Sequence, residues 1–167
     1  MRCLTEQEIA KWLADRFVTP SPYTNAKSPA NYVQFNLPRR PLTNALFIGQ
    51  LLELTDSEIL VHITDWPTYM PAEMIIMDSL RHESKETRNL IDAPGHLFSA
   101  QEHELAIALF GHSGTCEWNA YLYLPNDLAT LYNWEGESCD FWSCDAAMQH
   151  AVESLIGKLG LAIENAE

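Results

Sequence analysis

The six histidines are the residues whose types first invite a metal site. His96, His103 and His112 fall in one neighbourhood, together with Glu102 and Glu104. Helical zinc sites place their ligands one turn apart, whereas His103 and His112 would point to opposite sides of a helix at about 100° per residue. The spacing therefore predicts no metal site and no metal cofactor.

Ser113 and Cys116, close to a predicted turn, are the candidate nucleophiles, with His62 or His96 as a base. Nucleophilic catalysis requires a nucleophile, a base and an orienting group that meet in space. The chain contains neither a G-x-S-x-G elbow nor a G-x-x-x-x-G-K-[ST] phosphate-binding loop. We therefore expect no catalytic residues, no nucleotide chemistry and no cofactor.

The distribution of charge is more informative. The formal net charge is −13, and the segment 89–157 contains ten Asp and Glu residues without one Lys or Arg. Such a surface repels nucleic acid and anionic membranes and attracts basic partners. The predicted partner-binding residues are Glu117, Asp127, Glu135, Glu137 and Asp140. The alternative is that the acidic surface only keeps the protein soluble.

A second candidate site involves Asp65, Trp66 and His96. Trp66 follows a predicted strand and precedes Pro67, which biases it away from helical geometry, and His96 follows a Pro94-Gly95 turn. Loops at the ends of strands commonly carry binding residues. These residues predict a pocket for a small molecule, provided that the fold brings them together.

Helical periodicity and start signals identify the elements that would position these residues. Thr5 with Glu8, and Ser99 with Glu102, form capping boxes, and Pro71 suits a first helical turn. Ser143 is the predicted cap of the last helix. Helices are expected over 6–17, 41–54 and 71–82, from Ser99 to Gly114, and after Ser143.

Alternating apolar residues predict the strands. Residues 32–37 are expected to form an edge strand inside a long proline-rich loop, and residues 58–64 a central strand. The aromatic-rich stretch 116–143 predicts a β-meander over 117–124, 128–134 and 139–142. The expected fold is one α+β domain over 1–167, with a mainly antiparallel sheet and helices packed on one face.

The cysteine pattern and the hydropathy of the sequence predict the cellular location of the protein. The four cysteines contain no C-x-x-C pair, and no apolar run approaches the roughly 18 residues of a membrane span. The first residues also lack the apolar core of a secretory signal. We expect free thiols, no membrane association and a cytoplasmic location.

Three short blocks resemble recurring segments of a loosely defined group of small, uncharacterised bacterial proteins. They are Ile63-Thr64-Asp65-Trp66, Ala93-Pro94-Gly95-His96-Leu97-Phe98 and Trp118-Asn119-Ala120-Tyr121-Leu122. The resemblance implies no known activity.

The leading hypothesis is a non-catalytic cytosolic interaction domain that binds a basic protein, for example an immunity or inhibitor-type protein against a cationic toxin. The alternative from another class is a small-molecule-binding protein or enzyme with a pocket near Trp66 and His96. A homodimer formed through an exposed aromatic strand is the third hypothesis.

Overall fold

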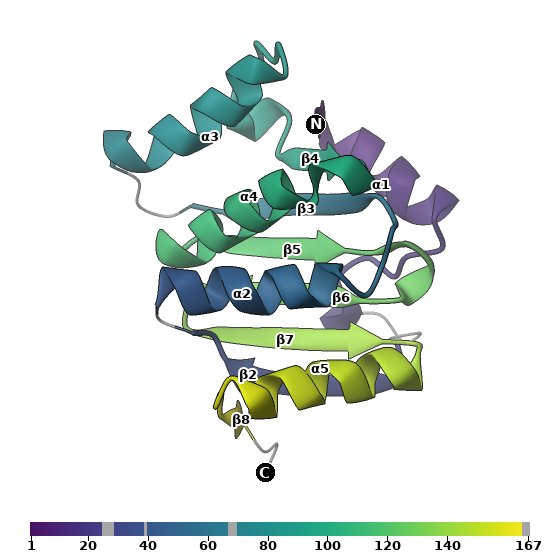
Figure 1. Ribbon diagram of the computed structural model, residues 1–167. Coiled ribbons are helices and arrows are strands. Elements are labelled where there is room, and N and C mark those ends of the chain that lie inside the picture. The colour runs from purple at the N-terminus through teal and green to yellow at the C-terminus, as the bar shows by residue number, and fades with distance from the viewer. Residues whose placement is uncertain (25–28, 39, 67–69, 165–167) are drawn as a thin grey trace.

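A computed structural model describes residues 1–167 except 25–28, 39, 67–69 and 165–167. Its sheet has eight strands, and each pair of neighbours is antiparallel (Figure 1). The strands are β1 (Arg2–Leu4), β2 (Asn31–Asn36), β3 (Ile59–Asp65), β4 (Gly95–Phe98), β5 (Asn119–Tyr123), β6 (Thr130–Trp134), β7 (Ser138–Ser143) and β8 (Ile163–Glu164). Their order is β1-β4-β3-β5-β6-β7-β2-β8. The predicted α+β class and the meander β5-β6-β7 are confirmed.

The described residues form five α-helices, which are α1 (Glu6–Asp15), α2 (Pro41–Leu52), α3 (Pro71–Glu83), α4 (His103–Thr115) and α5 (Ala146–Lys158). Both predicted capping boxes form, although that of Ser99 and Glu102 begins a short 3-10 turn before α4. The predicted cap of the last helix is wrong by two residues. Asp145, not Ser143, accepts the free amides at the start of α5, because its carboxylate reaches two N–H groups. None of the helices in the described residues is long and apolar enough to cross a bilayer.

The helices cover both faces of the sheet, so the expectation of one covered face is wrong. Helices α2, α4 and α5 lie together on one face, whereas α1 lies behind the β3–β5 end of the sheet (Figure 1). Strand β3 explains this arrangement, since Val61 packs in the main core and its neighbour Leu60 packs under α1 with Tyr121 and Tyr123. A strand that is apolar on both faces needs cover on both.

The edges of the sheet differ most from the prediction. Strand β2 is not an edge strand, because the two-residue β8 pairs with it on the outer side. Strands β1, β4 and β8 are absent from the sequence-based prediction, since each is too short for alternation to be visible. The predicted central strand is confirmed, as β3 lies between β4 and β5.

Candidate functional site

Three of the five predicted partner-binding acids converge at one end of the sheet. Glu117 follows the C-terminal end of α4, and Glu135 and Glu137 lie in the β6–β7 turn. These three residues line a recess of about 260 Å³, which we call the acidic recess. Its other lining residues are Pro38, Asn44, Gly114, Thr115 and Gly136.

Two buried asparagines hold the turn that carries Glu135. The Oδ1 atom of Asn119 accepts a hydrogen bond from the Glu135 amide at 2.9 Å, and the Oδ1 atom of Asn133 accepts one from the Gly136 amide at 2.9 Å. Asn133 also donates from Nδ2 to the Trp118 carbonyl at 2.7 Å. The sequence signal for these two supports is a polar residue inside an otherwise apolar strand, and neither asparagine was predicted as a site residue.

The backbone of the acidic recess is strained at two of its acids. Glu117 has φ 57° and Glu135 has φ 46°, both in the left-handed region that glycine tolerates best. A non-glycine residue there loses about 1–2 kcal/mol relative to ordinary geometry. The fold therefore keeps carboxylates at positions where another residue type would be more stable.

The acids of the acidic recess, Glu117, Glu135 and Glu137, have no ion-pair partner within the described part of the chain. The C-terminal end of α4 adds a partial negative charge beside Gly114 and Thr115. The recess is therefore suited to a cation.

The two remaining predicted acids do not belong to this site. Asp140 is 0% exposed, so its prediction as a partner-binding surface residue is wrong. Its carboxylate accepts hydrogen bonds from Tyr23, Tyr32 and Trp134 on the face of the sheet opposite α2 and α4. Asp127 is half-buried in the β5–β6 connection, at the other end of the meander, and accepts from the Thr19 amide and hydroxyl at 2.6 and 2.7 Å.

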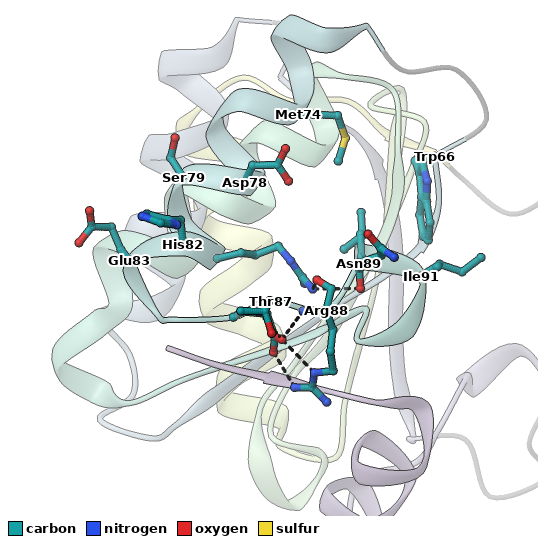
Figure 2. Close-up of a pocket in the computed structure, with 13 residues that line it drawn as sticks. Trp66, Met74, Asp78, Ser79, His82, Glu83, Thr87, Arg88, Asn89 and Ile91 are labelled. Carbon is teal, nitrogen blue, oxygen red and sulfur yellow. Dashed lines mark hydrogen bonds and ion pairs between the residues drawn. The ribbon is translucent and has the colours of Figure 1, made fainter.

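A cavity of about 890 Å³ lies between α3 and the segment 83–91, and we call it the Trp66 cavity. Figure 2 shows Trp66 and Ile91 on one side of it and Asp78 on the other. Of the three residues predicted to form a pocket, Trp66 alone is among those that line this cavity. Asp65 does not line the cavity, because it pairs with Asn119 at the end of β3.

His96 lies behind the wall of the Trp66 cavity. Its Nε2 accepts from Nη1 of Arg81 at 3.1 Å, and both residues are buried. Burial, with the Arg81 cation beside it, lowers the pKa of His96 to about 3, so the ring is neutral. Arg81 also donates to three backbone carbonyls, those of Arg88, Asn89 and Ala93. Its guanidinium therefore fixes the segment 88–93 and is not free for a ligand.

The residues considered for catalysis have structural partners. Ser113 is buried and donates to the Phe110 carbonyl at 2.7 Å. Cys116 lies 3.6 Å from the ring nitrogens of His112, but burial raises the pKa of this thiol to about 11, which disfavours the thiolate. Among the described residues, the hydrogen bond of His62 goes to Glu6 and that of His96 to Arg81, not to Ser113 or Cys116. The described part of the chain holds no cluster of three or more potential metal ligands, and all four cysteines are free thiols.

Comparison of the chain with protein-family models, with curated proteins and with solved structures finds no match. The resemblance to small uncharacterised bacterial proteins stays a prediction, and the function has to be inferred from the two sites.

Proposed function

We propose that this protein is a non-catalytic interaction domain that binds a basic protein through the acidic recess. The observation that carries the proposal is the convergence of Glu117, Glu135 and Glu137 around one concavity without an ion-pair partner in the described residues. An immunity or inhibitor-type protein that captures a cationic toxin is one concrete form of this function. The negative field would accelerate such a capture by electrostatic steering.

The test compares two variants with the same net charge. E117Q/E135Q/E137Q removes the three acids of the recess. E53Q/D56N/E104Q removes three exposed acids near the opposite ends of α2 and α4, which are 12 and 13 residues long, or about 18–20 Å at 1.5 Å per residue. Each variant is used, beside the unchanged protein, to capture proteins from native lysate at low and high salt, and captured proteins are identified by mass spectrometry.

We expect one or more basic proteins to be retained by the unchanged protein and by E53Q/D56N/E104Q, and lost with E117Q/E135Q/E137Q and at high salt. The retained protein is then purified and its dissociation constant is measured with each variant. Retention of the same proteins by the recess variant, or no salt-sensitive basic partner at all, would contradict the proposal.

A second function, small-molecule binding, is favoured by one observation, the Trp66 cavity of about 890 Å³. Its indole wall and mixed charges suit a planar polar molecule. A thermal-shift screen with the unchanged protein and with W66A tests it. A compound that stabilises only the unchanged protein supports the cavity as a site, whereas equal stabilisation of both contradicts it.

A further inference from the structure

We propose that a cavity under α1 binds a small aromatic amine, with its ring between α1 and β5 and its ammonium group beside Glu6. The cavity has a volume of about 450 Å³, and we call it the α1 cavity. It shares no lining residue with the acidic recess or with the Trp66 cavity. The inference therefore goes beyond the proposed function and does not depend on it.

The walls of the α1 cavity are mainly apolar and aromatic. Ile9 and Leu13 line it from α1 and Val18 from the segment after the helix, and all three belong to the core cluster under α1. Tyr121 and Tyr123 line it from β5, with ring planes 13° apart and centroids 5.0 Å apart. Small-molecule sites of about 300–1,000 Å³ have walls of this kind, and flat rings pack well against them.

Two alanines of α1 leave the space of the cavity open. Ala10 and Ala14 line it one helical turn apart, and both are exposed. A longer apolar side chain at these positions would occupy part of the space. The cavity therefore depends on small residues outside the core, and a substitution there can close it without removing a core side chain.

The polar end of the α1 cavity is formed by Glu6 and His62, whose Oε1 and Nε2 atoms are 3.1 Å apart. Strand register places His62 opposite Tyr121, so this pair adjoins the aromatic wall. Burial lowers the pKa of His62, so its ring is neutral and donates to Glu6 from Nε2. A carboxylate accepts several hydrogen bonds, and Glu6 can therefore accept another from a ligand.

The charge of the lining favours a cation over a neutral or anionic ligand. Among the described residues that line the cavity, Glu6 is the one carboxylate and none is Lys or Arg. Burial raises the pKa values of Tyr121 and Tyr123, so their hydroxyls are uncharged. The Glu6 side chain is 69% exposed, which places its carboxylate where an ammonium group can pair with it and still contact water. An aromatic amine matches both the apolar walls and this single carboxylate.

The experiment uses tryptamine, an indole that carries a primary ammonium group, as the probe. Three matched compounds separate its parts: 3-methylindole lacks the charge, indole-3-propionate has a carboxylate instead, and propylamine lacks the ring. Dissociation constants are measured by calorimetry, and the ring signals of Tyr121 and Tyr123 are followed by NMR. We expect tryptamine to shift these signals and to bind more tightly than each matched compound. The NMR signals locate the ligand in the unchanged protein, so the test does not depend on the folding of a variant.

A cavity-filling variant tests the place of binding. A10L/A14L fills the α1 cavity, and A108L/A147L makes the same change at exposed positions of α4 and α5. We expect A10L/A14L to bind tryptamine at least about tenfold more weakly, and A108L/A147L to bind it as the unchanged protein does. The melting temperature of each variant is recorded to verify that it is folded.

A charge variant tests the ammonium group. E6Q removes a carboxylate from the first turn of α1, and E104Q removes one from the first turn of α4. We expect E6Q to weaken tryptamine by about two- to fivefold, as for an exposed ion pair, and to leave 3-methylindole unaffected. E104Q should leave the affinity for tryptamine unchanged.

Several outcomes would overturn the inference. Equal affinity of A10L/A14L and the unchanged protein for tryptamine would place the binding elsewhere. Tighter binding of 3-methylindole or indole-3-propionate, or an E6Q variant that binds tryptamine normally, would reject the ammonium group. The absence of any shift in the two tyrosine ring signals at about 5 mM tryptamine, which would fill most of a site with a Kd of about 1 mM, would reject the site itself. None of these outcomes involves capture of a basic protein, so a failure of the proposed function is distinguishable.

Discussion

Gly136 lies directly against the carbonyl oxygen of Gly114, so that a Cβ atom added to Gly136 would be 1.9 Å from that oxygen. This contact presses the β6–β7 turn onto the C-terminal end of α4, and it brings Glu135 and Glu137 within reach of the residue after the helix, Glu117. The acidic recess therefore depends on a glycine that provides no charge itself.

The substitution G136A should destabilise the protein by about 2–4 kcal/mol, because it adds a backbone clash to the left-handed geometry at φ 71°. G160A is the matched control, since Gly160 has φ 67° but no atom within 4 Å of an added Cβ. It should lose only about 1 kcal/mol. Urea unfolding measures both values, and equal losses would mean that the contact with Gly114 is unimportant.

The substitution E117G should stabilise the protein by about 0.5–1 kcal/mol, because glycine relieves the left-handed strain while it adds some freedom to the unfolded chain. It should also weaken binding of the basic partner. E137G is the control, because Glu137 is not among the residues with positive φ and glycine should destabilise the protein there. Chemical denaturation and calorimetry are the measurements. If E117G were less stable than the unchanged protein, the left-handed backbone at position 117 would not be a strain that the glutamate imposes.

The substitution D140N should destabilise the protein by about 2–4 kcal/mol, because an amide cannot accept all the hydrogen bonds from Tyr23, Tyr32 and Trp134 that the carboxylate accepts. Y23F removes only one of these donors and should lose about 1 kcal/mol. Burial first, and then the hydrogen bond to Asp140, raise the pKa values of Tyr23 and Tyr32. An ultraviolet titration of D140N should show tyrosines that ionise at lower pH than in the unchanged protein.

The free energy of unfolding should fall as the pH is lowered from about 6.5 towards 3, in part through His96. The folded pKa of His96 is lowered to about 3, so between these values the unfolded chain binds a proton that the folded protein does not. His62, whose pKa burial also lowers, contributes in the same direction.

The variant H96Q should reduce the slope of unfolding free energy against pH by up to about 1.4 kcal/mol per pH unit below pH 6. Denaturant unfolding at several pH values measures this slope. H150Q changes an exposed histidine of α5 and serves as the control. An unchanged slope in H96Q would mean that His96 is not held neutral in the folded protein.

Local sequence patterns correctly predicted those helices and strands whose signal lies within their own residues. The capping box of Thr5 and Glu8 correctly located the start of α1, and aromatic alternation located β5 to β7. The strands that the patterns missed, such as β1 and β4, gain their hydrogen bonds from strands distant in sequence, and their few residues carry no periodicity. These segments are strands because they pair with strands that are distant in the sequence.

For the candidate site, too, the sequence determined one property and the tertiary structure determined another. The sequence by itself determined that the segment 89–157 is acidic and lacks Lys and Arg, since net charge is a sum over residues that folding does not alter. Only the tertiary structure decided which acids meet. Glu137 lines the acidic recess. Strand alternation turns Asp140, three residues later, to the other face of the sheet. There it is buried under Tyr23 and Tyr32, which come from distant segments of the chain. Convergence and burial depend on which distant residues the fold brings together, and composition contains no information about that.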